Sequence, residues 1–313
     1  MEGRELRGQF SARTGRAQVG LGTCLVFYNQ HMPELPEVET IARGVNERLR
    51  GDRIVQAWFG SHREPFKNSQ TRQAKGLEGR AILGVKRIGK HIVCDLGPVE
   101  RSNPNNSKAT TLAQWIVHLG MTGRLLVTTP EGPVAPHTHA RLGLASGREL
   151  RFVDPRRFGR LEFRDLSRIA GFTSPGAEPL TIGSDDFAGL FRGRRLAIKA
   201  ALLNQTLLAG VGNIYADESL FRACIRPRKM AGRLTRRELE RLRLALKGVL
   251  EHAIQLGGSS VSDYVDADGV RGFFQLEHCV YMRTGLACRR CETPIRRIVL
   301  AGRGTHYCPK CQG

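Results

Sequence analysis

Two closely spaced cysteine pairs near the C-terminus constrain the fold of this chain more than any other feature. Cys288 and Cys291 form the first Cys-x-x-Cys pair, Cys308 and Cys311 form the second, and sixteen residues separate the two pairs. Such pairs can supply the four thiolates of one tetrahedral zinc ion. Four buried free thiols are the alternative, and the spacing favours zinc over them. We therefore expect one structural Zn²⁺ rather than a disulfide framework.

The charge balance indicates a polyanionic partner. The 313 residues include 49 lysines and arginines against 29 acidic residues, which gives a formal net charge of +20. An excess of this size favours nucleic acid or an anionic membrane surface. No apolar run approaches the roughly 18–20 residues of a membrane-spanning helix, and the N-terminal segment GTCLVFY is too short for a secretory signal. We expect a cytoplasmic protein that binds nucleic acid and does not enter a membrane.

The segment between the cysteine pairs, PIRRIVLAGRGTHY, predicts what the zinc holds together. It reads as a strand, a glycine turn and a second strand. The metal would join the two ends of a β-hairpin, with Arg303 at the tip between Gly302 and Gly304. Arg303 is then either an ordinary solvated arginine or the tip of a finger that contacts DNA.

Hydrophobic periodicity predicts a helix, then a strand-rich region, then a helical region. Val38, Ile41, Val45 and Leu49 recur at helical spacing, and Gly51 suits the end of that helix. Short β-branched segments follow, and their spacing predicts an antiparallel sandwich or barrel. These segments are RIVQAWF, RAILGVKRI, HIVCDL, AQWIVHL, GRLLVTT, ARLGLAS and RLEFRDL. Three helical segments come next: LAIKAALLNQTLL, NIYADESLFRACI and TRRELERLRLALKGVLEHAIQLGG. The predicted fold class is α+β.

These patterns divide the chain into four parts. Residues 1–31 show no sustained periodicity, so we expect a non-native or disordered extension. An N-terminal β-sandwich domain with its helix should occupy residues 32–170, with a loop at 101–109. A helical domain should occupy residues 171–280 and end in a loop from residue 257. Residues 281–313 should form the zinc-bound hairpin.

The segment LLAGVGNIYADE at 207–218 predicts a phosphate-binding turn. Gly210 and Gly212 permit a tight turn between helices, and Asn213 lies where a helix N-cap is expected. Free backbone N–H groups at a helix N-terminus attract phosphate. The alternative is a helix hairpin that only packs, and the positive charge of the chain favours phosphate.

Three further motifs combine cationic, aromatic and sulfur side chains. DPRRFG at 154–159 offers an arginine for bases or phosphates and Phe158 for wedging between bases, or it is a surface turn with a core phenylalanine. HLGMTG at 118–123 contains Met121, whose ordinary role would be core filling. PHTH at 136–139 lacks carboxylate or cysteine partners, which favours a phosphate contact or plain surface over a metal site.

The stretch HMPELPEVET at 31–40 raises a chemical question about Pro33. Within a chain its nitrogen is a tertiary amide, whereas at a free N-terminus it is a secondary amine. Such an amine can attack the C1′ atom of a sugar and form an iminium, which makes C2′ acidic. Glu34 is adjacent and could transfer protons. Glu37 lies on the same first turn, where the helix dipole alone also favours an acid.

These motifs, together with GKHIVCDL and GRGTHYCPKCQ, resemble the bacterial formamidopyrimidine-DNA glycosylase family from Met32 to Gln312, in family order. The resemblance implies an N-terminal β-sandwich, a helix–two-turn–helix module and a zinc finger, with DNA between the domains. It implies a bifunctional glycosylase and lyase that removes oxidised purines such as 8-oxoguanine and formamidopyrimidines from duplex DNA, then nicks the abasic site by β,δ-elimination. It further implies a monomer that associates with the bacterial nucleoid through DNA.

The resemblance also assigns roles to individual residues. Pro33 matches the nucleophile, Glu34 the acid beside it, Lys90 a lysine acting in elimination and backbone contact, and Arg303 the finger arginine. Met121, Arg156 and Phe158 match the residues that fill the gap left by an everted base. The remaining matched DNA-contact positions are His118, His137, Arg194, Lys199, Asn213 and Tyr281.

Two departures from the family pattern leave alternatives open. The 31 preceding residues make Pro33 an internal residue, which we expect translation from Met32 and removal of that methionine to resolve. Met282 in VYMRTG replaces the usual glycine, which puts the backbone conformation there in question. A member of the related endonuclease VIII branch acting on oxidised pyrimidines and a non-catalytic DNA-binding protein are the nearest alternatives. A membrane-surface protein would require neither the zinc finger nor the glycine turn.

Overall fold

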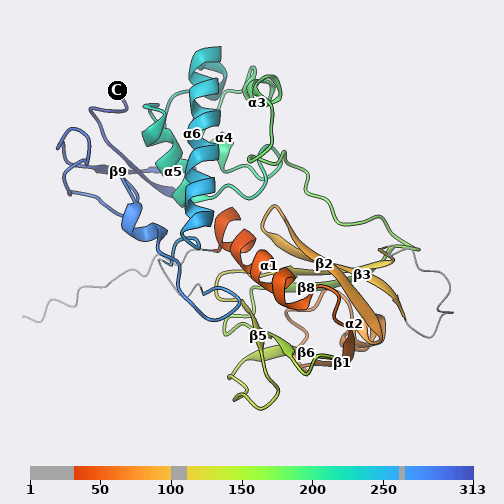
Figure 1. The fold of residues 1–313 in the computed structure, drawn as a ribbon. Coiled ribbons are helices and arrows are strands. Elements are labelled where there is room, and N and C mark those ends of the chain that lie inside the picture. The colour runs from red at the N-terminus through yellow and green to blue at the C-terminus, as the bar shows by residue number, and fades with distance from the viewer. Residues whose placement is uncertain (1–31, 100–110, 261–264) are drawn as a thin grey trace, which may run out of the picture.

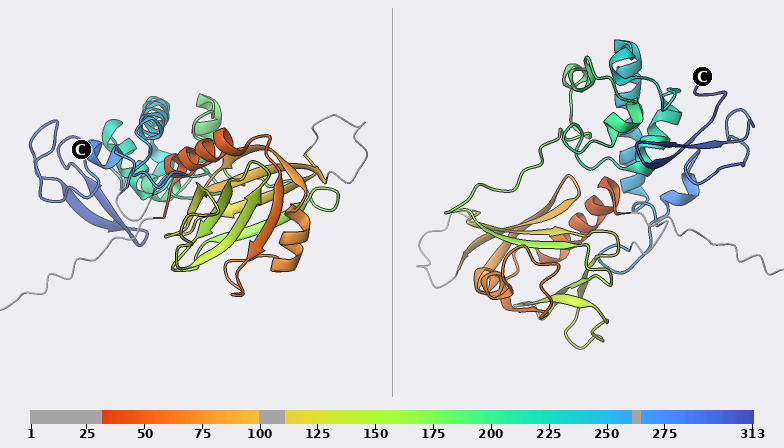
Figure 2. Two further views of the ribbon diagram at one scale, coloured as in Figure 1. Left: turned by 60° about the horizontal axis from the view of Figure 1, so that its bottom comes forward. Right: turned by 180° about the vertical axis from the view of Figure 1, so that it is seen from behind.

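The computed structural model describes residues 32–99, 111–260 and 265–313 (Figure 1). The predicted N-terminal extension and the loop expected at 101–109 lie outside these ranges. The described chain forms an N-terminal β-sandwich, a helical domain and a C-terminal hairpin, with helix α1 between the first two (Figures 1 and 2). This architecture confirms the predicted α+β class.

Helix α1, Leu35–Leu49, confirms the first predicted helix. Its N-cap is Glu34, whose backbone N–H donates to the Glu37 carboxylate over 2.9 Å. Gly51 follows the helix with φ +87°, a conformation that glycine adopts without steric cost. The four periodic apolar side chains are buried, so the helical pattern arose from one core-facing stripe.

In the described part of the N-terminal domain, two four-stranded antiparallel sheets pack face to face. Their strand orders are β1-β6-β7-β5 and β2-β3-β4-β8. The strands are β1 (Ile54–Phe59), β2 (Arg80–Ile88), β3 (His91–Val99), β4 (Ala113–His118), β5 (Arg124–Thr128), β6 (Thr138–Leu144), β7 (Glu149–Val153) and β8 (Arg160–Asp165). Apolar side chains of both sheets and of α1 form one core.

Two elements of this domain were missed by the sequence analysis. Strand β7 has every residue buried, but its sequence ELRFV contains two charged residues. Glu149 and Arg151 form a buried ion pair of 3.0 Å, which makes the charged side chains tolerable there. Helix α2, Gln70–Leu77, buries only Gln73 and Leu77 and therefore lacks a clear apolar stripe.

The helical domain is less regular than predicted. Its described elements are α3 (Ser184–Phe191), α4 (Ile198–Leu202), α5 (Asn213–Arg222), η1 (Ala231–Arg233), α6 (Arg236–Gln255) and η2 (Phe274–Glu277). The prediction of α6 was confirmed, with a Thr235–Glu238 capping box at its start. The expected helix LAIKAALLNQTLL instead ends at Leu202. The Gln205 amide then holds the turn, donating to the Leu203 and Val211 carbonyls and accepting from Gly210 N–H.

Helix α1 also belongs to the second domain. Leu35 lies in the core of the helical domain, and its N–H donates to the Gly210 carbonyl over 3.0 Å. The segment after α6 crosses in the opposite direction, because Ala267 is buried in the sandwich core and accepts a hydrogen bond from Val127 N–H. Arg87 adds a bridge between Glu39 on α1 and Glu178 beyond the sandwich, at 2.8 Å to each. The two domains are therefore joined by the start of α1, by the segment after α6 and by the Arg87 ion pairs.

The predicted C-terminal hairpin is confirmed, but Arg303 is the first residue of its second strand rather than the tip of the turn. Strands β9 (Arg296–Leu300) and β10 (Arg303–Tyr307) pair antiparallel, and Ala301 and Gly302 form the turn with positive φ. Met282, in the preceding loop, has φ +57°. That left-handed conformation is the one glycine adopts most readily, so the methionine keeps a glycine-like backbone at this position.

Candidate active site and zinc finger

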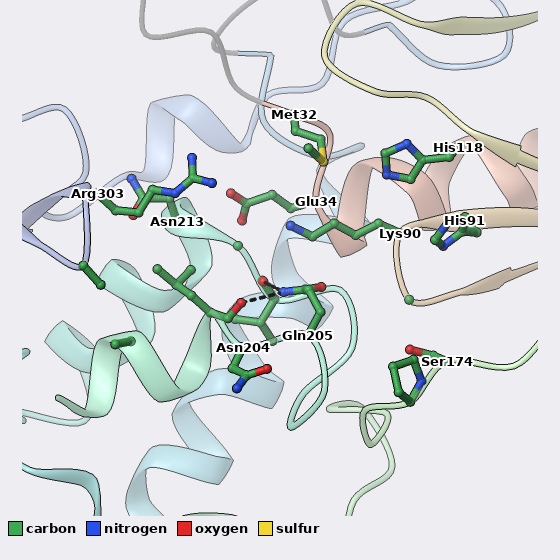
Figure 3. Close-up of a pocket in the computed structure, with 17 residues that line it drawn as sticks. Met32, Glu34, Lys90, His91, His118, Ser174, Asn204, Gln205, Asn213 and Arg303 are labelled. Atoms are coloured by element: carbon green, nitrogen blue, oxygen red, sulfur yellow. Dashed lines mark hydrogen bonds between the residues drawn. The ribbon is translucent and has the colours of Figure 1, made fainter. Parts of the chain in front are cut away.

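A cleft of about 530 Å³ lies where the sandwich, the helical domain and the hairpin meet (Figure 3). Three of its lining residues are Glu34 from the start of α1, Lys90 from the β2–β3 turn and Arg303 from the hairpin. Their side chains point toward one space in Figure 3. The lining also includes Met32, His91, His118, Asn204, Gln205 and Asn213. The structure thus brings together three of the four predicted catalytic residues around one cavity.

Pro33 is buried beside this cleft, between Met32 and Glu34. Met32 lines the cleft directly, so the peptide bond to Pro33 is made at its edge. In this chain the Pro33 nitrogen is therefore an amide, as the sequence requires. Residue 33 therefore lies between two residues that line the cleft, and its nitrogen is chemically blocked while residue 32 is attached.

The N-terminus of α5 binds a carboxylate of the protein itself. Glu34 accepts from Ile214 N–H at 3.2 Å and from Tyr215 N–H at 3.5 Å. These two N–H groups are therefore not free for phosphate, contrary to the expectation from the sequence, whereas a phosphate contact by Asn213 stays a prediction. Asn213 is also the first helical residue, and Gly212 occupies the N-cap. The helix dipole that was expected to attract an external anion instead stabilises Glu34.

Gly212 is required for this contact. A Cβ atom built at Gly212 would lie 2.1 Å from Glu34 Cδ and 2.3 Å from its Oε1. The carboxylate therefore occupies the space that any larger residue would fill. The glycine that the sequence analysis assigned to a tight turn serves here to admit the Glu34 side chain.

Burial raises the pKa of Glu34 to about 7, with the Glu37 charge adding to the rise and Lys90 and the α5 N–H groups opposing it. Glu37 is held beneath it by Ser259 N–H at 2.7 Å and by the Tyr215 hydroxyl. Burial also raises the pKa of Glu37. A carboxyl group with a pKa near neutrality can both give and take a proton.

Lys90 and Arg303 supply positive charge to the same space. Lys90 follows Gly89, whose φ of +59° turns the chain between β2 and β3. Burial lowers the pKa of Lys90, while the nearby Glu34 and Glu37 carboxylates act in the opposite direction. Arg303 is exposed at the start of β10, so its guanidinium remains available to a ligand.

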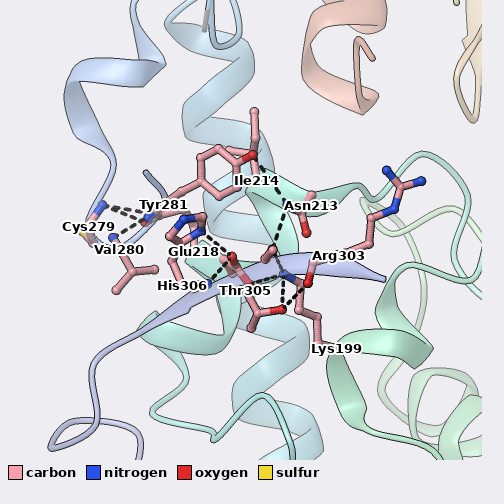
Figure 4. Close-up of polar contacts among 12 residues, drawn as sticks. Lys199, Asn213, Ile214, Glu218, Cys279, Val280, Tyr281, Arg303, Thr305 and His306 are labelled. Carbon is pink, nitrogen blue, oxygen red and sulfur yellow. Dashed lines mark hydrogen bonds and ion pairs between the residues drawn. The ribbon is translucent and has the colours of Figure 1, made fainter. Parts of the chain in front are cut away.

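A buried network fixes the base of the hairpin against α5 (Figure 4). Lys199 is fully buried, donates to the Gly304 carbonyl at 2.8 Å and to Thr305 Oγ1 at 2.9 Å, and forms an ion pair of 2.7 Å with Asp217. The family resemblance implied that Lys199 contacts DNA. That assignment does not fit the structure, because the ammonium group is buried and has three partners inside the protein.

Asn213 and Tyr281 border the same network. The Asn213 amide donates to the Gly304 carbonyl at 3.0 Å and lies 3.5 Å from the Tyr281 hydroxyl. Tyr281 is almost fully buried, which raises its pKa and leaves it without a surface for direct DNA contact. Within the described ranges, Asn213 Oδ1 is buried without a hydrogen-bond partner, and Asn213 remains on the wall of the cleft.

The structure brings Met121, Arg156 and Phe158 together on two packed turns. The Arg156 guanidinium lies over the Phe158 ring, 4.7 Å from its centroid, and Phe158 is 47% exposed. A Cβ atom at Gly120 would lie 2.5 Å from the Phe158 carbonyl carbon, so the Met121 turn and the Phe158 turn touch through their backbones. Phe158 is therefore not a core residue, which excludes the alternative of a surface turn with a core phenylalanine.

Asp154 organises these turns and was missed as a functional position. It is fully buried, and its carboxylate accepts from Thr122 Oγ1 at 2.5 Å, Gly159 N–H at 2.7 Å and Arg156 N–H at 3.3 Å. One side chain therefore joins the HLGMTG and DPRRFG motifs. The aspartate followed by proline was the available sequence signal, since such pairs open turns by accepting from later N–H groups.

The other predicted contacts differ in accessibility. His118 lines the cleft with its ring 4.8 Å from that of His91, and burial lowers the pKa of each imidazole to about 4. His137 is exposed with φ +63°, away from the lining of the cleft. Arg194 is exposed between α3 and α4, where its Nε donates to the Leu190 carbonyl. All three stay predictions as DNA contacts.

The four cysteines of the C-terminal pairs converge. All four sulfur atoms lie within 4.8 Å of one another, with Cys291–Cys308 at 3.4 Å and Cys288–Cys311 at 4.0 Å. A tetrahedron of thiolates about 2.3 Å from zinc has sulfur–sulfur edges of about 3.8 Å. Backbone N–H groups donate to Cys288 Sγ and Cys308 Sγ, as expected for metal-bound thiolates. The site fits one structural Zn²⁺, as the sequence predicted.

Replacing Cys308 with Ser should release the zinc, disorder the hairpin and weaken DNA binding, because metal binding and local folding are coupled. Metal content by atomic absorption, hairpin order by hydrogen exchange and affinity for a lesion duplex would measure the three effects. Cys224→Ser is the matched control, since Cys224 lies outside the sulfur cluster. Full lesion affinity in a metal-free Cys308→Ser protein would contradict a structural role for zinc.

A β-sandwich joined to a helix–two-turn–helix domain and a zinc finger, with an acid, a lysine and an arginine in the cleft between them, defines a DNA glycosylase of the helix–two-turn–helix class. Family models match the chain for the formamidopyrimidine-DNA glycosylase N-terminal domain (residues 32–161), its H2TH domain (residues 175–265) and the zinc finger found in FPG and IleRS (residues 285–313). The chain belongs to the formamidopyrimidine-DNA glycosylase family.

Relatives and solved structures agree with this assignment. Formamidopyrimidine-DNA glycosylase of Solibacter usitatus is 44% identical over 283 residues, covering 90% of this chain and 99% of the relative. The crystal structure of the Thermus thermophilus MutM (FPG) protein matches with a TM-score of 0.74 at 41% identity, covering 90% and 99% of the two chains. The Lactococcus lactis protein in complex with Fapy-dG-containing DNA matches with a TM-score of 0.76 at 33% identity, covering 89% and 99%. Within the described residues, no helix is long and apolar enough to cross a membrane.

Proposed function

We propose that this chain removes oxidised purines, including 8-oxoguanine and formamidopyrimidines, from duplex DNA and then nicks the resulting abasic site. The DNA glycosylase activity follows from the family to which the chain belongs. Support for the lesion class comes from the Lactococcus lactis relative, whose structure holds Fapy-dG-containing DNA. We place the enzyme in the bacterial cytoplasm, acting as a monomer on chromosomal DNA.

The observation that carries the mechanism is the position of Glu34. Its carboxyl is buried, has a pKa near 7 and follows directly after Pro33 at the edge of the cleft. Once Pro33 is the first residue, its secondary amine attacks C1′ of the damaged nucleotide, and the base leaves with its bonding electrons and a proton. Glu34 takes the proton that the amine loses and gives a proton to O4′ as the C1′–O4′ bond of the sugar ring breaks. The product is an open-chain sugar joined to Pro33 through an iminium.

The same iminium drives strand cleavage. It withdraws electrons from C2′, so a proton is lost there and the C3′–oxygen bond breaks in β-elimination. A second loss of a proton breaks the C5′–oxygen bond in δ-elimination and leaves a one-nucleotide gap. Lys90 and Arg303 hold the phosphates that flank the sugar and stabilise the departing phosphate oxygens. Both cations lie on the cleft wall, as this role requires.

Met121, Arg156 and Phe158 fill the space that the everted nucleotide leaves in the duplex. Phe158 is exposed, and the Arg156 guanidinium packs over its ring. This contact restricts the ring and suits it to insert between base pairs. Arg156 Nη1 is buried without a hydrogen-bond partner in the described structure. That donor is available to the estranged base, and a cytosine offers acceptors for it.

Lesion choice is the direct test of this proposal. Protein beginning at Pro33 should excise 8-oxoguanine opposite cytosine faster than it excises dihydrothymine from an otherwise identical duplex. Gel separation of nicked strands after single-turnover reactions measures both rates. A clear preference for the oxidised pyrimidine would place the chain with the endonuclease VIII branch. DNA binding without excision of either base would instead support a non-catalytic DNA-binding protein.

A further inference from the structure

Asp217 is a fully buried aspartate on α5 that does not line the cleft, and the proposed chemistry does not use it. It lies four residues, or about one helical turn, after Asn213, where α5 begins. Removing a carboxylate from water costs several kcal/mol, so a fully buried aspartate requires strong partners. Both carboxylate oxygens of Asp217 have such partners, and each partner either belongs to β10 or contacts it.

The two oxygens of Asp217 hold β10 in different ways. Oδ2 accepts from the His306 backbone N–H at 2.8 Å and lies 3.3 Å from His306 Nδ1. Oδ1 forms an ion pair of 2.7 Å with Lys199, whose ammonium donates to the Gly304 carbonyl and to Thr305 Oγ1. Lys199, Thr305 and His306 lie together in Figure 4. Three consecutive residues of β10 are therefore attached to Asp217, either directly or through Lys199.

The residue that precedes these three is Arg303, which lines the cleft with an exposed side chain. Its carbonyl accepts from Thr305 Oγ1 at 3.2 Å, so the contact between Lys199 and Thr305 extends to the Arg303 backbone. The partner strand β9 is mostly exposed and offers little packed support. The contacts that fix the Arg303 backbone therefore come mainly from α4 and α5.

Helix α5 also holds the acid of the cleft. At its N-terminus the N–H groups of Ile214 and Tyr215 donate to the Glu34 carboxylate, and Asp217 holds β10 within the next turn. One helix thus supports both Glu34 and Arg303, whose side chains point toward the same space in Figure 3. A displacement of β10 relative to α5 would change the distance between these two groups without altering either of them.

We propose that Asp217 is a positioning residue that holds Arg303 in place for the second of the two eliminations. This inference rests on the proposed function, in which β-elimination breaks the C3′–oxygen bond and δ-elimination breaks the C5′–oxygen bond. Each step removes one proton from the sugar and releases one phosphate with the bonding electron pair. A shift of β10 moves Arg303 but leaves Lys90, which belongs to the sandwich, in place. The two steps should therefore respond differently to a change at Asp217.

The proportion of the two nicked products tests this proposal. Protein beginning at Pro33 is mixed with a pre-formed abasic duplex, and a denaturing gel separates the β-product, which keeps an unsaturated sugar, from the β,δ-product, which ends in phosphate. Asp217→Asn keeps an acceptor for the His306 N–H and removes the charge that pairs with Lys199. Conversion of β-product to β,δ-product should slow roughly tenfold to a hundredfold, as expected for a displaced catalytic group. The first nick should slow much less.

A second variant and a control separate positioning from general destabilisation. Thr305→Val removes one contact to Lys199 and the contact to the Arg303 carbonyl without leaving a buried charge unpaired, so it should slow the same step by a smaller factor. Asp185→Asn is the matched control, because Asp185 is an exposed aspartate on α3 that pairs with Arg236. If Asp217→Asn and Thr305→Val slowed both steps by the same factor, with zinc content retained, the proposal would fail.

Binding provides a test that requires no catalysis. Affinity for a duplex with an uncleavable tetrahydrofuran abasic site is measured for Asp217→Asn, for Arg303→Ala and for the double variant. Each single substitution should weaken binding roughly three- to tenfold, and the double variant should bind no more weakly than Arg303→Ala, because no guanidinium remains to be positioned. Additive losses would overturn the proposal, as would unchanged affinity of Asp217→Asn. Absence of nicking by every protein would count against the proposed function alone.

Discussion

Borohydride should cross-link protein that begins at Pro33 to an 8-oxoguanine:cytosine duplex, and should fail to cross-link protein that retains residues 1–31. Borohydride reduces an iminium to a stable amine, which fixes the enzyme on its DNA. The lone pair of an amide nitrogen is delocalised into the carbonyl group, so an internal Pro33 cannot form the iminium. The full-length protein should still bind lesion DNA, because the cations of the cleft are present in both proteins. Denaturing gels would measure the cross-linked fraction.

The control for this experiment separates the amine from the proline ring. Pro33→Gly in the shortened protein retains a primary amine, so some cross-linking should survive. Intact mass must verify that each preparation has the stated N-terminus. Equal cross-linking by full-length and Pro33-start proteins would disprove the mechanism and indicate a lysine nucleophile, with Lys90 as the nearest candidate in the cleft.

Glu34→Gln should abolish base excision and preserve part of the lyase activity on a pre-formed abasic site. Excision requires a proton donor and acceptor beside C1′, which glutamine cannot provide. At an abasic site the glycosidic bond is already broken, and the Pro33 amine can still attack the open sugar. Parallel assays on 8-oxoguanine and abasic duplexes measure the two activities. Equal losses on both substrates would show that Glu34 acts mainly by shaping the cleft.

The same substitution should change how stability depends on pH. The pKa of Glu34 rises from 4.5 to about 7 on folding, so the folded state binds more protons than the unfolded state between these values. The contribution of Glu34 to the free energy of unfolding is full below pH 4.5 and is lost as pH rises through 7. The total loss is roughly 3 kcal/mol, because each unit of difference between the two pKa values corresponds to about 1.4 kcal/mol. Glutamine does not ionise. The free energy of unfolding of the Glu34→Gln full-length protein should therefore decline less over this range, and parallel curves for the two proteins would contradict the buried-acid assignment.

Local sequence signals predicted the parts of the site whose geometry is local. The cysteine spacing predicted the zinc site because a tetrahedral ion imposes fixed distances on its four ligands. The hairpin that carries Arg303 followed from the intervening segment. Helices α1 and α6 were predicted from single apolar stripes. In each case the residues that define the feature lie close together in the sequence.

Contacts between distant residues could not be predicted in this way. The α5 N-terminus was predicted to bind an external phosphate, but two of its N–H groups donate to the Glu34 carboxyl, which lies about 180 residues earlier in the sequence. Lys199 was assigned to DNA from the family resemblance, and its burial beside Asp217 does not fit that role. Strand β7 was missed because its two charged residues neutralise each other inside the sheet. These outcomes depend on tertiary pairing, which periodicity and composition do not record.

Helix α1 contributes side chains to both hydrophobic cores. This bears on whether the enzyme or the DNA changes shape when the two bind. Two domains joined only by a flexible linker could close around a duplex. Here Leu35 packs in the core of the helical domain and Ala267 packs in the core of the sandwich. Closure of the two domains would therefore break apolar contacts. We therefore expect the duplex rather than the enzyme to change shape on binding, and the free energy needed to bend DNA depends on its base steps. The stiffness of the DNA around a lesion would then contribute to recognition of that lesion.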